Sequence, residues 1–197
     1  MMNARGSAPT LAERFWTAST PTERAVRMAV LAVAGSVLMW ASAKVQVPFY
    51  PVPMTMQTAV AFLIGIAYGP RLGVATIALY LAQGALGWPV FAGTPEKGIG
   101  LPYMLGPTGG YLLGFVAAAG ITGWVAERSS HWLAIGLGVL AATVAMYVLG
   151  AGWLSTMIGF DKAIALGVVP FLLGDLVKLL LVTALAAAGL RTLRHNR

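Results

Sequence analysis

Residues 132–154 read WLAIGLGVLAATVAMYVLGAGWL and contain no charged side chain. A helix that crosses about 30 Å of hydrocarbon takes about 20 residues, so this stretch is long enough to span a membrane. Further apolar segments lie on both sides of it, at 25–47, 54–69, 72–86, 109–126 and 168–190. The pattern predicts an all-α membrane protein, a bundle of about six transmembrane helices.

The composition agrees with a bilayer as solvent. Of the 197 residues, 58% are hydrophobic and only 10% are charged, whereas about 25% are charged in a soluble domain. The net charge of +7 does not indicate nucleic-acid binding, because Lys and Arg lie in short gaps between apolar segments rather than on one solvated face. We expect one membrane domain over 25–190, between a cytoplasmic segment at 1–24 and a basic tail at 191–197.

The joining segments are of two kinds. Gly69-Pro70-Arg71 is a turn signal between two segments that are short for membrane spans, so we expect a tight helical hairpin there. The loops that follow the first and third segments, at 47–53 and 87–111, are rich in Pro, Gly and aromatic residues.

The distribution of positive charge predicts the orientation, because Lys and Arg in short loops are retained on the cytoplasmic side. With the N-terminus inside, the inner side carries Arg5, Arg14, Arg24, Arg27, Arg71, Arg128, Arg191, Arg194 and Arg197, and the outer side carries Lys44, Lys97 and Lys162. We therefore expect a multi-pass protein of the cell (inner) membrane with both termini in the cytoplasm. The aromatic loops then face outward.

Two opposite charges interrupt the last apolar segment. Asp175 and Lys178 are three residues apart, which places them on one face of a helix. At about 1.5 Å per residue they lie about 8 and 12 Å below Pro170. An ionisable group at such depth costs about 2.5–3.5 kcal/mol and normally faces the bundle interior or a wet cavity. A structural ion pair is one interpretation, but we favour a polar ligand site, because apolar residues could fill a structural role at lower desolvation cost.

Other polar groups in the apolar segments are Gln57, Gln83, Tyr80, Tyr147 and Lys44. Gln83 lies level with the second aromatic loop, where an interhelical hydrogen bond and a ligand contact are both open. The glycines of residues 106–111, GPTGGY, allow close approach of a ligand or a helix, and the following helix N-terminus offers N–H groups to a carboxylate. The predicted ligand residues are Asp175, Lys178, Gln83, Phe91, Gly109, Gly110, Tyr111 and Tyr147.

The sequence lacks the motifs of catalysis. It has no His-Glu-x-x-His, no Gly-x-Ser-x-Gly, no nucleotide-binding motif and no carboxylate cluster, so we expect no enzyme activity, cofactor or metal site. No ATPase is built in, so concentrative uptake would draw its energy from another protein. Ala25 and Ala29 form a small-xxx-small pair that permits close contact, either within the bundle or with a partner.

Several blocks, in this order, carry a family resemblance: PVPMTMQT at 51–58, GPRLG at 69–73 with LYL at 79–81, GWPVFA at 87–92, GPTGGYLLGF at 106–115 and GDLVK at 174–178. Together they resemble the BioY family, the biotin-binding substrate (S) components of energy-coupling-factor transporters. The resemblance implies a six-helix S-component fold that holds biotin near the outer surface, with Asp175 and Lys178 taking part in binding. It also implies partners, namely a transmembrane coupling protein and a pair of cytosolic ATPases.

Biotin fits the polar groups in chemical terms. Asp175 can accept hydrogen bonds from the ureido N–H groups, while Lys178 or Gln83 can donate to the ureido oxygen. Aromatic residues of the outer loops could cover the apolar part of the ligand. Two alternatives stay open: an S component for another vitamin, since a fold does not fix the substrate, and an independent membrane carrier.

Overall fold

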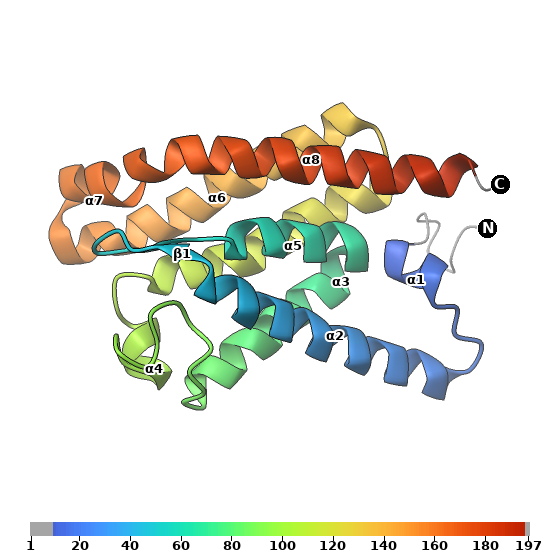
Figure 1. Cartoon of the computed structure of the whole chain (residues 1–197), viewed down its shortest axis with the longest axis horizontal. Coiled ribbons are helices and arrows are strands. Elements are labelled where there is room, and N and C mark those ends of the chain that lie inside the picture. The colour runs from blue at the N-terminus through green and yellow to red at the C-terminus, as the bar shows by residue number, and fades with distance from the viewer. Residues whose placement is uncertain (1–9, 196–197) are drawn as a thin grey trace.

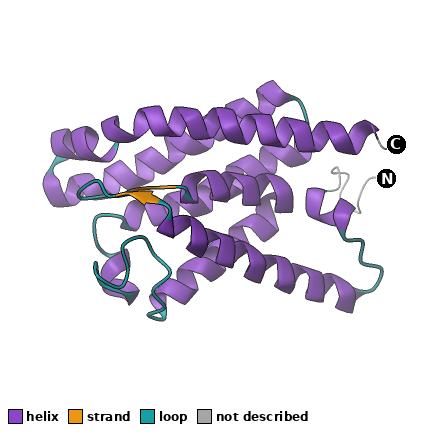
Figure 2. Ribbon diagram, in the orientation of Figure 1, coloured by secondary structure: helices purple, strands orange, loops and turns teal. Residues whose placement is uncertain are grey.

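A computed structural model describes residues 10–195 of the chain, which are almost entirely helical (Figures 1 and 2). The elements are α1 (Leu11–Phe15), α2 (Pro21–Lys44), β1 (Gln46–Val47), β2 (Met54–Thr55), α3 (Gln57–Ala85), α4 (Gly100–Met104), α5 (Gly109–Arg128), α6 (Trp132–Ile158), α7 (Phe160–Gly167), the 3-10 turn η1 (Val169–Phe171) and α8 (Leu172–His195). The two strands pair antiparallel, with Gln46 opposite Thr55. The predicted all-α membrane fold is confirmed, with a short β-hairpin added.

The element α3 is a helical hairpin rather than one straight helix. Gly69 has φ 78° and ψ 171°, a conformation that glycine adopts without steric cost. In a straight helix Gln57 and Tyr80 would be about 35 Å apart, yet Gln57 Nε2 lies 2.7 Å from the Tyr80 hydroxyl. The two halves therefore lie side by side, as the Gly-Pro-Arg turn predicts.

The hairpin explains the number of membrane passes. Within the described residues, five helical stretches are long and apolar enough to cross a membrane, at 21–44, 57–85, 109–128, 132–158 and 160–189. Because the stretch at 57–85 folds back on itself at Gly69, it supplies two short passes. The structure thus agrees with the expected six-helix bundle.

The loops rich in Pro, Gly and aromatic residues and the connections that carry arginine lie at opposite ends of the bundle. At one end, on the left in Figure 1, lie the β-hairpin, α4 and α7. Lys44 Nζ lies 3.0 Å from the carbonyl oxygen of Pro89 there, and Trp153 donates to the Gly106 carbonyl at 2.9 Å. At the other end, on the right in Figure 1, lie α1 and the C-terminal end of α8. We refer to these as the loop end and the arginine end.

The predicted terminal segments are partly helical. Thr10 and Thr20 form capping boxes with Glu13 and Glu23 at the starts of α1 and α2, and Arg27 donates to the Trp16 carbonyl at 2.8 Å. At the other terminus α8 continues into the predicted tail as far as His195. Residues 1–9 and 196–197, with Arg5 and Arg197, lie outside the described part.

The outer faces of the long helices are apolar. Val33, Leu137 and Leu173 expose 54%, 65% and 75% of their surface, far more than leucine or valine exposes in the core of a soluble protein. Helix α5 lies between α3 and α6 and packs against both. The arrangement suits a bundle whose solvent is hydrocarbon, with its polar groups turned inward.

Candidate functional site

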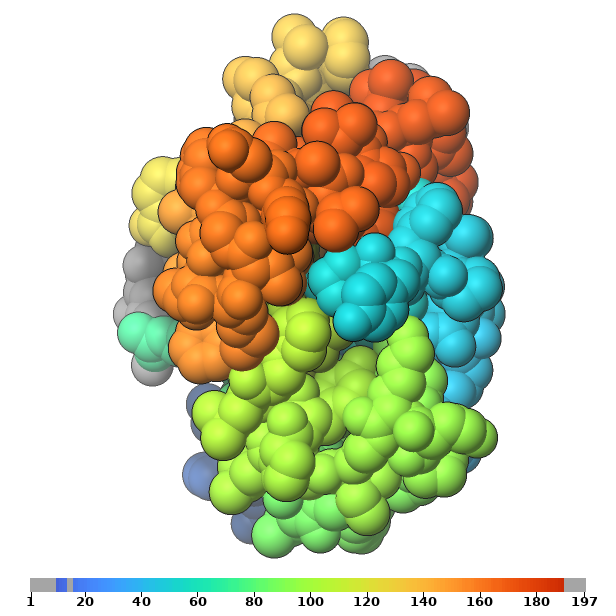
Figure 3. Space-filling view, turned by 90° about the vertical axis from the view of Figure 1, so that its left-hand side faces the viewer, coloured from blue at the N-terminus to red at the C-terminus, as the bar shows by residue number. Residues whose placement is uncertain are grey.

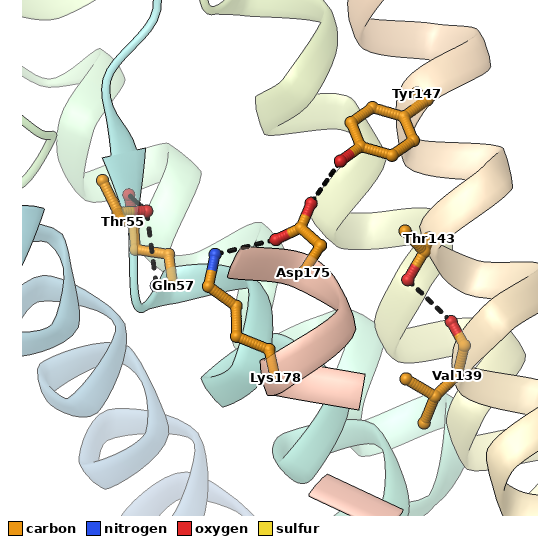
Figure 4. Close-up of polar contacts among 7 residues, drawn as sticks. All are labelled: Thr55, Gln57, Val139, Thr143, Tyr147, Asp175 and Lys178. Carbon is orange, nitrogen blue, oxygen red and sulfur yellow. Dashed lines mark hydrogen bonds and ion pairs between the residues drawn. The ribbon is translucent and has the colours of Figure 1, made fainter. Parts of the chain in front are cut away.

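The site is built around a buried ion pair at the start of α8. Pro170 lies in the turn η1, just before the helix, and Asp175 falls in the first helical turn, where the helix dipole favours a carboxylate. Lys178 Nζ lies 2.8 Å from Asp175 Oδ1, and each side chain is 7% exposed. Tyr147 of α6 donates to Asp175 Oδ2 (Figure 4). Both carboxylate oxygens are therefore paired.

A small cavity of about 50 Å³ lies beside this pair. Its wall combines a few polar groups with apolar and aromatic side chains, contributed by the β-hairpin, α3, the following loop, α4, α5, α6, η1 and α8. The lining residues are Val52, Pro53, Met54, Thr55, Gln57, Thr58, Ala92, Tyr103, Thr108, Tyr111, Leu112, Phe115, Met146, Tyr147, Phe171, Asp175 and Lys178. A pocket for a drug-sized ligand measures about 300–1,000 Å³, so the cavity in this conformation is smaller than such a pocket.

Several of the segments that line the cavity or lie beside it meet at the loop end. Figure 3 looks onto this end, where the β-hairpin (cyan), the segment that runs to the start of α5 (green) and α7 (orange) come together. Lys44 Nζ lies 3.2 Å from the carbonyl oxygens of both Phe91 and Thr94, in addition to its bond with Pro89. The end of α2 thus holds the loop between α3 and α4 in place.

Four of the predicted ligand residues line the cavity: Asp175, Lys178, Tyr111 and Tyr147. The Tyr111 hydroxyl donates to the Gly167 carbonyl at 2.7 Å, which ties α5 to the end of α7. The sequence pattern thus identifies the two charged residues of the cavity wall, together with one tyrosine on α5 and one on α6.

Phe91 does not line the cavity and instead supports its wall from behind. The ring is fully buried. It stacks on Tyr103 with 4.9 Å between the ring centroids, and it meets the Tyr80 ring edge-on with 5.5 Å between the centroids. Tyr103, which does line the cavity, donates to the Ala92 carbonyl at 2.8 Å. Burial raises the pKa of Tyr103, so its hydroxyl stays a neutral donor at physiological pH. Of these two stacked rings, it is therefore Tyr103 that forms part of the cavity wall.

Gly109 and Gly110 also lie outside the cavity lining, so their contact with ligand stays a prediction. A Cβ at Gly109 would collide with the Met104 carbonyl oxygen, and one at Gly110 would collide with the Leu149 carbonyl oxygen. The two glycines allow close packing of the start of α5. Of the two roles open to them, the structure supports helix contact.

Gln83 is likewise away from the cavity. Its Nε2 donates to Ser36 Oγ at 3.3 Å and so joins α3 to α2. The interhelical hydrogen bond is thus the interpretation that the structure supports. The glutamine of the cavity wall is Gln57, which is only 3% exposed and whose position in an apolar segment was already visible in the sequence.

Ala25 and Ala29 are both exposed on α2. They do not pack inside the bundle, so the structure leaves this face free for contact with another molecule. Within residues 10–195 no cluster of three His, Cys, Asp or Glu side chains could hold a metal ion.

The fold and the cavity define a class of protein: a polytopic membrane protein with a small cavity, bordered by a buried ion pair, close to one end of its helical bundle. Within that class the chain belongs to the BioY family, whose model matches residues 13–195. Members of this family are transport proteins rather than enzymes.

Relatives and a solved structure agree with this assignment. The chain is 40% identical over 136 residues to a probable biotin transporter BioY of Pyrococcus horikoshii, a match that covers 69% of this chain and 79% of the relative. It is 38% identical over 164 residues to the biotin transporter BioY of Thermotoga maritima, with 81% and 93% covered. The crystal structure of the S-component for biotin from an ECF-type ABC transporter has the same fold, with a TM-score of 0.75, 22% identity and coverage of 87% and 94%.

Proposed function

We propose that this protein captures biotin at the outer face of the cell membrane as the substrate-binding subunit of an energy-coupling-factor transporter. The observation that carries the proposal is the buried Asp175–Lys178 pair in the wall of a cavity. The relatives of this BioY-family chain are named biotin transporters, and family membership supports the same ligand here.

The paired charges retain capacity for a ligand. Each oxygen of Asp175 accepts one hydrogen bond from the described residues, and Lys178 uses one of its three N–H groups. Asp175 can therefore accept from a ureido N–H group while Lys178 donates to the ureido oxygen. Phe115, Met146 and Phe171 offer an apolar surface to the thioether ring and the aliphatic chain.

Transport requires partners outside this chain. Because arginines predominate at the end opposite the cavity, we place that end in the cytoplasm, in the cell membrane, with both termini inside. Biotin then reaches the loop end from outside. The exposed Ala25 and Ala29 on α2 support a contact with a transmembrane coupling protein, which a pair of cytosolic ATPases would drive.

The test is titration calorimetry with biotin on protein purified in detergent. We expect tight binding that Asp175→Ala and Lys178→Ala each weaken at least about 100-fold, because either change leaves a buried charge without its partner. Asp161→Ala and Lys162→Ala are matched controls, since they change exposed residues of the same types on α7 and should bind as the wild type does.

Three results would contradict the proposal. Unchanged biotin affinity in folded Asp175→Ala and Lys178→Ala would remove the assigned site. Tighter binding of thiamine or riboflavin than of biotin would show that the assigned substrate is wrong. Uptake into liposomes that contain only this chain would favour an independent carrier.

A further inference from the structure

A chain of buried hydrogen bonds joins the two halves of the α3 hairpin and reaches the cavity wall at Gln57. The Tyr80 hydroxyl lies 3.0 Å from the Val90 carbonyl oxygen and 2.7 Å from Gln57 Nε2. Tyr80 is 0% exposed, Val90 6% and Gln57 3%, so water does not compete for these hydrogen bonds. Tyr80 comes from the second half of the α3 hairpin and Gln57 from the first.

The chemistry of the three groups fixes the direction of each bond. A carbonyl oxygen can only accept, so the single proton of the Tyr80 hydroxyl points to Val90. Towards Gln57 the hydroxyl must then act as acceptor, which requires the amide nitrogen of Gln57 to face it. The orientation of the amide, which distance alone would leave ambiguous, therefore follows from the position of Tyr80.

With the nitrogen anchored, the amide oxygen Oε1 lies on the other side. Thr55 Oγ1 donates to it at 3.3 Å and accepts from the main-chain N–H of Gln57 at 3.3 Å. An amide oxygen accepts two hydrogen bonds. Among the described residues Gln57 therefore keeps one acceptor position on Oε1 and one N–H for a ligand in the cavity that it lines.

Gln57 faces the same cavity as the ion pair. In Figure 4 the Lys178 ammonium lies between Gln57 and the Asp175 carboxylate. The wall thus presents three polar groups to one cavity: the Gln57 amide with a free acceptor position on Oε1, the Lys178 ammonium as donor and the Asp175 carboxylate as acceptor. The edge of a cyclic urea carries the complementary groups, a donor, an acceptor and a donor.

We propose that Gln57, oriented by Tyr80, is a specificity-determining residue that accepts a hydrogen bond from the second ureido N–H of the ligand. The inference rests on the proposed function, since it assigns the third contact in the same site. Gln57 binds the ligand directly, while Tyr80 is a positioning residue that acts through Gln57.

Biotin affinity in four proteins tests the assignment: wild type, Gln57→Met, Tyr80→Phe and the double variant. Methionine keeps the length of the side chain without its hydrogen bonds, so we expect the Kd to rise about 10- to 100-fold. Phenylalanine keeps the ring against Phe91 but frees the amide, with an expected rise of about 3- to 10-fold. The double variant should lose less affinity than the sum of the two single losses, since Tyr80 acts mainly through Gln57 and only its bond to the Val90 carbonyl is lost independently.

Biotin methylated at one ureido nitrogen, each nitrogen in turn, identifies the contact. One of the two analogues lacks the N–H group that faces Gln57. Wild type and Gln57→Met should therefore bind that analogue with the same affinity. The matched control is Gln46→Met, an exposed glutamine of the β-hairpin, which should bind as the wild type does.

The outcomes separate this inference from the proposed function. Three results would overturn the assignment of Gln57: a wild-type Kd in folded Gln57→Met, a Gln57→Met substitution that weakens the binding of biotin and of both analogues equally, or an additive loss of affinity in the double variant. If Asp175→Ala still binds biotin weakly in any of these cases, the proposed function stands. A wild-type protein that does not bind biotin would overturn both.

Discussion

At the scale of single residues, the most constrained group is the Asp175 carboxylate. Lys178, Tyr147 and the start of α8 all stabilise its negative charge, and neither Asp175 nor Lys178 is more than 7% exposed. Buried pairs of this kind owe their stability to mutual neutralisation, so removing one partner costs more than removing both.

This asymmetry separates the two interpretations of the pair. Lys178→Met should lower the free energy of unfolding by about 3–5 kcal/mol, because it leaves a buried carboxylate without its cation. Adding Asp175→Asn should restore most of the stability but none of the biotin binding. Thermal unfolding and calorimetry of both variants in detergent give the two quantities. Recovery of binding together with stability would make the pair purely structural.

The two glutamines of the membrane segments also have different predicted effects. Gln83→Met removes one interhelical hydrogen bond to Ser36, so it should reduce stability by about 0.6 kcal/mol, the average for such bonds in membrane proteins. Biotin affinity should not change, because the side chain is not part of the cavity wall. A Kd more than about tenfold weaker in calorimetry would return Gln83 to the site.

There is a physical reason why the sequence alone predicts Gln83 as a ligand residue. Spacing along a helix predicts the depth of a side chain in the membrane, and by depth Gln83 lies beside the aromatic loop. The direction in which the side chain points depends on how the hairpin packs against α2 and α5. The pair Asp175–Lys178 was predictable because three-residue spacing fixes a shared face without that information.

At the scale of elements, the loop between α3 and α4 is held by side-chain bonds to its main chain. Lys44 donates to carbonyl oxygens on it, Tyr80 donates to Val90, and Tyr103 donates to Ala92. Before α4 begins at Gly100, the main-chain hydrogen bonds of the loop are those of turns, such as the bond from Lys97 N–H to the Gly93 carbonyl at 2.9 Å. The side-chain donors add to these turns, and Lys44 is the charged one among them.

Replacing Lys44 should loosen this loop. Lys44→Met removes charge-assisted hydrogen bonds to three carbonyl groups, so we expect biotin to dissociate about 3- to 10-fold faster while its association rate changes less. Stopped-flow release of labelled biotin measures both rates. Lys162→Met, which removes an exposed lysine at the same end, is the control. Equal dissociation rates in the two variants would mean that the loop holds its position without Lys44.

Helix α2 begins at the arginine end, where a contact with a coupling protein is proposed. Ala29 is exposed there, so Ala29→Leu should leave stability and biotin binding unchanged while it impairs assembly with a coupling protein by blocking close helix contact. Co-purification with the coupling protein and ATPases, compared with calorimetry on the isolated subunit, measures the two effects. Loss of biotin binding would instead assign Ala29 to packing within the bundle.

At the scale of the whole molecule, the order of the elements was predictable and the closure of the cavity was not. Apolar lengths, the turn at Gly69 and the segregation of arginines predict the passes, the hairpin and the two ends. The pairing of Gln46 with Thr55, the helix α7 and the turn η1 add structure to the loop end. These depend on contacts between loops distant in sequence, for which apolar periodicity carries no signal.

The orientation of the molecule is the prediction on which capture from outside depends. Because the chain has no cysteine, single substitutions Tyr50→Cys at the loop end and His131→Cys at the arginine end give unique labelling sites. Both positions are exposed. In intact cells a membrane-impermeant maleimide should label Tyr50→Cys and should reach His131→Cys only after the membrane is permeabilised. The opposite pattern would place the cavity on the cytoplasmic side, where this subunit could not receive biotin from outside.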